Sequence, residues 1–134
     1  MKRREALSRL TGFIAVAALR PAAFRPFRTK PFEHPEPRPG ITGDHVLADA
    51  DLPPKKAVRQ AYTNARANPE LFDGVYCVCD CRESLKHRSL LTCFESKQPT
   101  GCMACQEEAE LVAKLVKDGK TLPDIRAAID KKWG

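Results

Sequence analysis

Six cysteines lie within a short part of this 134-residue chain, and no cysteine lies elsewhere. They form a C-x-C-x-C triplet, a single cysteine and a C-x-x-C pair, with one histidine between the triplet and the single cysteine. The candidate metal ligands are Cys77, Cys79, Cys81, His87, Cys93, Cys102 and Cys105. Thiolate sulfur and imidazole nitrogen are the ligands that soft and borderline metal ions prefer. The spacing therefore predicts a single thiolate-rich metal site.

A disulfide framework is the main alternative for an even number of cysteines in an exported protein. Three bridges would also stabilise a domain too small to bury a large core. Members of the triplet cannot readily pair with one another, because a disulfide requires a restricted Cα separation and dihedral angle. Each would need one of the three distant cysteines, which leaves this alternative open. The triplet favours sulfurs that wrap one metal ion or bridge several.

The C-x-x-C pair, Cys102 and Cys105, opens a predicted helix, so its sulfurs are expected to converge on one ion. A helix N-terminus favours the thiolate form of cysteine, which also suits a thiol–disulfide redox pair. That second hypothesis is weakened because no strands are predicted from which a thioredoxin-like sheet could be built. Met103 is expected in the core rather than at the metal.

The number of sulfurs bears on the identity of the metal. Six sulfurs exceed the four ligands of one structural zinc ion, which favours a polynuclear site. Copper(I) is the first choice on softness, with zinc or an iron–sulfur cluster as alternatives.

The elements that position these residues are predicted to be helices, because no segment alternates apolar and polar residues over strand length. Helical spacing of apolar residues predicts about four short helices around a Cys-rich loop, over 55–67, 84–94, 103–118 and from Thr121 onward. Gly119 ends the third helix, and Thr121 with Asp124 forms a capping-box pair at the start of the fourth. Residues 70–82 are expected to form an irregular Cys-rich turn. The predicted fold class is all-α.

The N-terminal region has the composition of an export signal followed by a linker. Residues 1–23 combine a basic start with a short apolar run that is too short to span a bilayer, and the adjacent arginines resemble a twin-arginine signal. Residues 24–44 are rich in proline and predict a linker in which His34 is solvated. The folded domain is then expected over 45–134, in the periplasm or outside the cell.

The charge of the chain excludes one class of function. The net charge is +6, but residues 1–23 contain five basic side chains and one acidic side chain, so the remainder carries only +2. Nucleic-acid binding would require a basic stripe on the folded part, and we do not expect it. No nucleophile–base pattern predicts a hydrolase, and an enzyme is not the favoured class.

Residues 62–134 resemble the PCYCGC motif-containing (lipo)protein family of bacteria. The resemblance lies in these blocks: Tyr62, Ala65-Arg-Ala-Asn-Pro69, Tyr76-Cys77-Val-Cys79-Asp-Cys81, His87-Arg-Ser-Leu-Leu-Thr-Cys93-Phe94, Cys102-Met-Ala-Cys105-Gln, Gly119 and Ile125-Arg126. Only the cysteines of the family motif are kept, since Tyr76, Val78 and Asp80 replace its proline, tyrosine and glycine. Members are often lipid-anchored through an N-terminal cysteine, and no cysteine precedes Cys77, so such an anchor is not expected. The resemblance supports the site rather than a reaction.

The sequence as a whole predicts an exported metal-binding protein for metal binding, delivery or resistance. Its expected partners are the metal ion and a metal-accepting protein, with no stable membrane span. The redox protein and the disulfide-stapled structural domain remain the alternatives.

Overall fold

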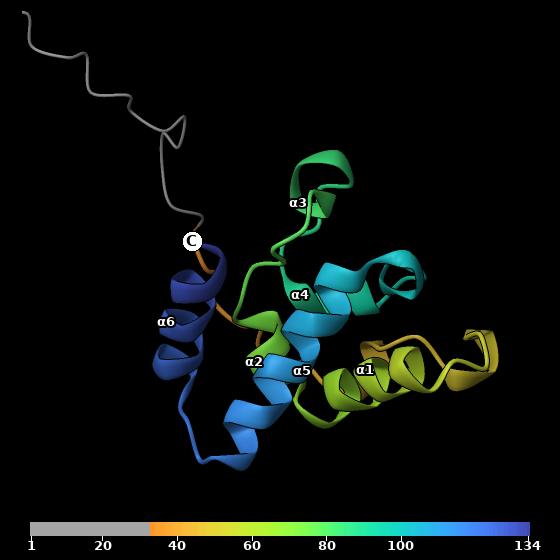
Figure 1. Cartoon of the computed structure of the whole chain (residues 1–134), viewed down its shortest axis with the longest axis horizontal. Coiled ribbons are helices and arrows are strands. Elements are labelled where there is room, and N and C mark those ends of the chain that lie inside the picture. Colours follow the sequence, from red (N-terminus) through yellow and green to blue (C-terminus); the bar gives the residue numbers. More distant parts are fainter. Residues whose placement is uncertain (1–32) are drawn as a thin grey trace, which may run out of the picture.

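The structure is a computed structural model that describes residues 33–134, so the predicted export signal lies outside the described residues. Within 33–134 it contains helices and no strand, which confirms the all-α prediction (Figure 1). The α-helices are α1 (Lys56–Ala67), α2 (Pro69–Asp73), α3 (Cys81–Ser84), α4 (Leu90–Phe94), α5 (Met103–Lys117) and α6 (Leu122–Trp133). Three short 3-10 helices, η1 (Gly43–His45), η2 (Asp49–Asp51) and η3 (Gln98–Gly101), lie in the connections.

The core lies where α1, α2, α4 and α5 meet, and α6 packs against α5. Phe94 of α4 is central, because its ring meets Tyr62 of α1 edge-on at a centroid distance of 4.8 Å and Phe72 of α2 at 5.7 Å. Edge-to-face contacts of this kind are favoured between aromatic rings. Ile125 and Ile129 of α6 are fully buried, as the helical spacing predicts.

The prediction of one helix over 84–94 is wrong, because α3 ends at Ser84 and α4 begins only at Leu90. Between α3 and α4, Lys86 adopts a left-handed conformation with φ of 58°, which a continuous helix does not allow. Ser89 then starts α4, since its Oγ accepts the Thr92 N–H at 3.2 Å. Figure 1 shows α3 and its flanking loops projecting from the body of the molecule.

The expected irregular turn over 70–82 is also partly wrong, since α2 occupies its first residues. Pro69 ends α1 through its effect on the preceding residue and also serves as the first residue of α2. Proline suits that position because a first-turn residue needs no intrahelical N–H donor.

The boundary between α5 and α6 agrees with the sequence. Gly119 has a φ of +73°, and its N–H donates to the Val116 carbonyl at 3.0 Å. Thr121 and Asp124 form the predicted capping box at the start of α6. The third and fourth helices thus begin and end close to the residues that the spacing indicates.

The described part of the proline-rich segment lies along the helices. The His34 side chain is only 9% exposed, and its ring stacks on Tyr76 at a centroid distance of 4.3 Å. Arg126 of α6 donates to the carbonyl oxygens of Pro35 and Gly74, each at 2.8 Å. The expectation that His34 is solvated is therefore wrong.

No helix among residues 33–134 is both long enough and apolar enough to cross a membrane.

Candidate metal centre

The cysteines come from four neighbouring parts of the chain. Cys77 and Cys79 lie on the loop after α2, Cys81 begins α3, Cys93 lies in α4, and Cys105 lies in the first turn of α5. Because α2, α4 and α5 pack against one another, these segments meet at one place. The Leu90 N–H donates to the Val75 carbonyl at 2.9 Å, which joins the loop to the start of α4.

Four sulfurs form the first group, which we call the four-sulfur group: Cys77, Cys79, Cys81 and Cys105. Their Sγ atoms all lie within 4.8 Å of one another. The Sγ of Cys105 lies 3.3 Å from that of Cys77 and 3.5 Å from that of Cys79. A tetrahedron with metal–sulfur bonds of about 2.3 Å has edges of about 3.8 Å, so a slight outward movement would admit an ion.

A second group, the Cys81–His87–Cys93 group, contains two sulfurs and one imidazole. The Sγ atoms of Cys81 and Cys93 lie 3.1 Å apart, and Nδ1 of His87 lies 3.1 Å from the Cys93 Sγ. Cys81 belongs to both groups. The structure therefore brings six of the seven candidate ligands into two adjoining sets.

Cys102 is the one candidate ligand that lies in neither group. It is the N-cap residue of α5, and its Sγ accepts the Cys105 N–H at 3.4 Å. Met103, next to it, is 68% exposed, so its expected place in the core is wrong. Cys102 and Met103 therefore form a sulfur-bearing edge at the start of α5.

All six cysteines lie in the described part of the chain, and all six are free thiols. Even the Cys81–Cys93 pair, at 3.1 Å, is well outside the length of about 2.05 Å of a disulfide bond. The arrangement found is thus a cluster of thiols rather than a set of three bridges.

Three thiols of the cluster, those of Cys77, Cys93 and Cys105, favour their protonated form. The hydrogen bond with Cys105, together with burial, raises the pKa of Cys77 far above its usual value. A metal ion must therefore displace a proton from such a group in order to bind. Metal binding at this site would be coupled to proton release.

Glu108 is a buried carboxyl behind the thiol-bearing loop, and sequence reasoning missed it. Its Oε2 accepts the Val78 N–H at 2.9 Å, whereas Oε1 has no hydrogen-bond partner. Burial raises its pKa to about 8, so the group is protonated at neutral pH and adds no negative charge beside the thiolates. The sequence feature that indicates a buried Glu108 is its position on the same face of α5 as the buried residues Cys105 and Val112.

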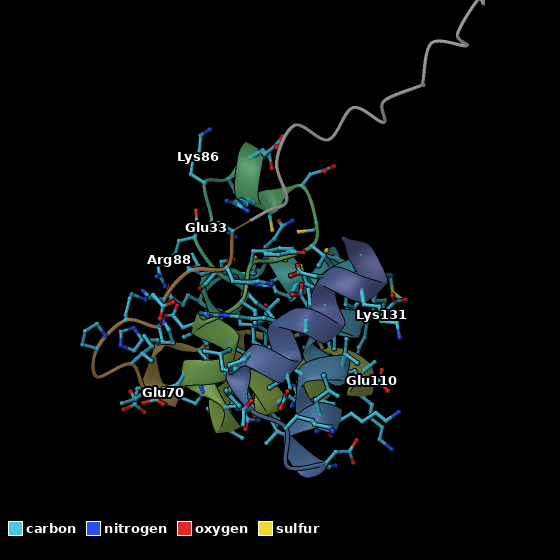
Figure 2. All side chains as sticks on the ribbon, turned by 90° about the vertical axis from the view of Figure 1, so that its left-hand side faces the viewer. Glu33, Glu70, Lys86, Arg88, Glu110 and Lys131 are labelled. Carbon is cyan, nitrogen blue, oxygen red and sulfur yellow. The ribbon has the colours of Figure 1, made fainter. Side chains whose placement is uncertain are left out.

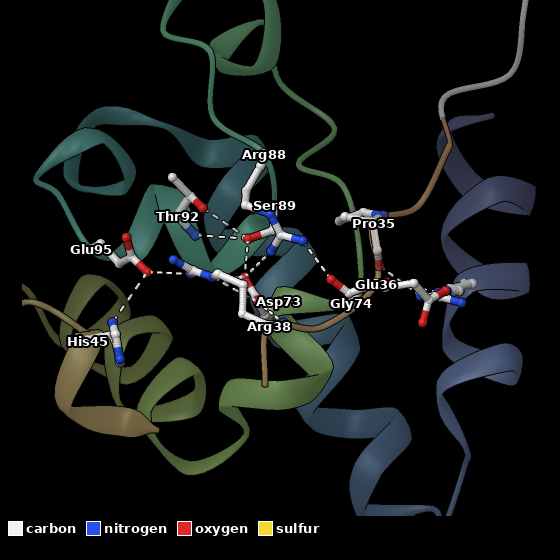
Figure 3. A network of polar contacts seen from close by, with 11 residues as sticks. Pro35, Glu36, Arg38, His45, Asp73, Gly74, Arg88, Ser89, Thr92 and Glu95 are labelled. Carbon is white, nitrogen blue, oxygen red and sulfur yellow. Dashed lines mark hydrogen bonds and ion pairs between the residues drawn. The ribbon is translucent and has the colours of Figure 1, made fainter. Parts of the chain in front are cut away.

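A polar network supports the segments on either side of the site (Figure 3). Asp73 is fully buried and accepts hydrogen bonds from the Arg38 side chain and, at 2.7 Å, from the Ser89 hydroxyl. Arg88 forms a further ion pair with it at 2.8 Å. Burial alone would raise the pKa of Asp73, but the hydrogen bonds from Arg38 and Ser89 hold it down at about 2. The network joins the end of α2 to the cap of α4, which carries Cys93.

A second contact fixes the residue before Cys77. The Tyr76 N–H donates to Nδ1 of His34 at 3.3 Å, so the imidazole carries its proton on Nε2 and donates to Asp130 at 3.1 Å. The Tyr76 hydroxyl also donates to Asp130, at 2.9 Å. These bonds hold the start of the thiol-bearing loop against α6.

The fold and the site define a small all-α domain with clustered thiols. Residues 50–134 match the family described as "Protein of unknown function with PCYCGC motif", and the chain belongs to that family. The resemblance seen in the sequence is thus confirmed. No curated protein and no solved structure matches the chain.

Proposed function

We propose that this protein is exported and holds copper(I) in its thiolate cluster, for delivery to an acceptor protein or for copper resistance outside the cytoplasm. The observation that carries the proposal is the four-sulfur group, in which Sγ atoms from the loop, α3 and α5 all lie within 4.8 Å of one another. Each of these sulfurs is a soft ligand.

The choice of copper(I) rests on the composition of both groups. Every ligand atom in them is sulfur or imidazole nitrogen, and no carboxylate of the described residues joins either group. An all-sulfur set suits copper(I), zinc or iron, whereas oxygen ligands would favour magnesium or calcium. Zinc and iron–sulfur binding are therefore the competing outcomes of the metal analysis.

The proposed route of export fits a preformed metal site. The twin-arginine-like signal in residues 1–23 belongs to a pathway that carries folded proteins. Loading in the reducing cytoplasm would then protect the thiols, because a bound thiolate is less open to oxidation. Export without that route would expose free thiols to an oxidising compartment first.

The test is metal content and free thiols, measured on the full chain purified without oxygen. The proposal expects stoichiometric copper whose amount falls in Cys79→Ser and is unchanged in the control Ser84→Ala, since Ser84 lies in α3 and in neither group. Stoichiometric zinc or iron, lost in the same variant, would replace copper and keep the metal site. Metal-free protein with no free thiols would refute metal binding.

A second candidate is thiol–disulfide exchange through Cys102 and Cys105. The observation in its favour is that Cys102 is partly exposed at the start of α5 and accepts the Cys105 N–H. Cysteines of exchange-active pairs commonly lie at the start of a helix. Rapid reduction of a small-molecule disulfide by the wild type, abolished in Cys102→Ser while metal content stays unchanged, would support this function. Equal rates in both proteins would exclude it.

A further inference from the structure

We propose that the cluster holds two metal ions that share the Cys81 thiolate, and that the ion in the Cys81–His87–Cys93 group is the one exchanged with a partner. This inference rests on the proposed function. It adds that the centre holds two ions, and that one ion stays bound while the other is exchanged.

The two groups share Cys81 but are otherwise separate sets of ligands. A single tetrahedral ion takes four ligands, and the four-sulfur group supplies that number. His87 and Cys93 are then left over, although the Cys93 Sγ lies only 3.1 Å from both the Cys81 Sγ and Nδ1 of His87. These three ligand atoms lie within 4.8 Å of one another, which is the arrangement of a second binding site.

Cys81 is the residue that permits both sites to be filled. A thiolate sulfur has more than one lone pair and can donate to two ions at once. When Cys81 is shared between the two ions, five cysteines and one histidine give one ion four ligands and the other ion three. Without a shared thiolate, the second ion would have only Cys93 and His87.

The two sites differ in how firmly the protein holds them. Cys105 lies on α5, and the Val78 N–H between Cys77 and Cys79 is fixed by the buried Glu108. The other site lies partly on the projecting segment, where Figure 2 shows Lys86 directed away from the body of the molecule. The backbone at Lys86 is left-handed, with φ of 58°, and this strained residue directly precedes His87.

The composition of the second site also suits exchange. Its three ligands leave a coordination position open, which structural four-ligand sites do not. His87 is partly exposed, so the incoming ligand of a partner can approach the ion from solvent. A soft ion with three-coordinate geometry, copper(I), is the expected occupant.

The experiment is anaerobic titration of the full, reduced chain with copper(I), in competition with a chromophoric copper(I) chelator. The proposal expects two ions per wild-type chain and one ion per chain in His87→Ala and in Cys93→Ser. His45→Ala, which removes a histidine outside both groups, is the matched control and should keep two ions. If circular dichroism shows that His87→Ala has lost its helices, His87→Gln replaces it in the titration.

X-ray absorption provides a readout that a purely structural role of His87 would not change. A nitrogen ligand and a metal–metal contribution should be present in the wild type and absent in the His87 variants. Two ions retained in His87→Ala with unchanged spectra, or one ion in the wild type, would overturn the inference while leaving the proposed function intact. No copper in any protein would instead refute the proposed function.

Discussion

Replacing Asp73 with asparagine measures what the polar network contributes to the fold around the metal centre. Asp73 is fully buried, and its pKa falls from 3.8 to about 2. Each pKa unit corresponds to about 1.4 kcal/mol, so the ionised carboxyl stabilises the native state by about 2 kcal/mol at neutral pH. The neutral amide of Asp73→Asn would also remove the ion pair of Arg88, whereas Arg38 keeps its ion pair with Glu95 at 2.6 Å.

The expected loss in Asp73→Asn is about 2–3 kcal/mol. Breaking a buried ion pair typically costs about 3–5 kcal/mol. The value here should lie lower, because Arg38 keeps Glu95 as its counter-ion and the Arg88 side chain is 37% exposed, so that water can solvate its guanidinium group. The assay is urea unfolding of the reduced, metal-free protein at pH 7, with an unchanged m-value. Glu70→Gln, an exposed carboxylate in the same helix, is the control.

The sign of the pH dependence follows from the lowered pKa. The folded protein binds the Asp73 proton more weakly than the unfolded chain, so this stabilisation is complete above about pH 4 and disappears as the pH falls toward about 2. The difference in unfolding free energy between wild type and Asp73→Asn should shrink by about 2 kcal/mol over that window. A difference below about 0.5 kcal/mol at pH 7, or one that does not change with pH, would refute the reasoning.

Three further predictions concern the site and its helices. Because the pKa of the Cys77 thiol is raised, metal affinity should rise by at least about tenfold per pH unit between pH 6 and pH 8, measured by chelator competition. Glu108→Gln should bind metal within about threefold of wild type because it keeps a neutral acceptor for the Val78 N–H, whereas Glu108→Ala should lose about tenfold in the same assay. Gly119→Ala should lower the unfolding free energy by about 1 kcal/mol because φ is +73°, whereas Gly101→Ala, without positive φ, should not; urea unfolding tests both.

The sequence predicted the helices whose ends carry local signals. Gly119 and the Thr121–Asp124 pair define the boundary between α5 and α6, and both act through residues within one turn. The break between α3 and α4 was missed although Ser89 is a good N-cap residue, because Leu90, Leu91 and Phe94 extend a helical pattern from Ser84. Local apolar spacing does not reveal a left-handed residue such as Lys86.

The sequence predicted that its cysteines lie together, but it did not predict their division into two groups or the place of Cys102 outside both. Clustering in the sequence was sufficient to expect that the cysteines meet. The approach of Cys93 to Cys81 depends on how α4 packs against α2 and α5, and that is a tertiary contact. The burial of His34 was missed for the same reason, since its partners Tyr76 and Asp130 are distant in the sequence.

The projecting segment explains why metal binding and local order should be linked in this protein. Within α3 only Cys81 is buried, and the following Leu85 is 49% exposed. The segment therefore has almost no apolar side chain to anchor it, unlike α4, where Leu90, Leu91 and Phe94 are fully buried. Cys81 anchors it through its contacts with Cys93 and with the other three sulfurs of the four-sulfur group. A metal ion that binds these sulfurs would take the place that packed side chains have elsewhere, so that under the proposed exchange the order of this segment would depend on the ion that is released.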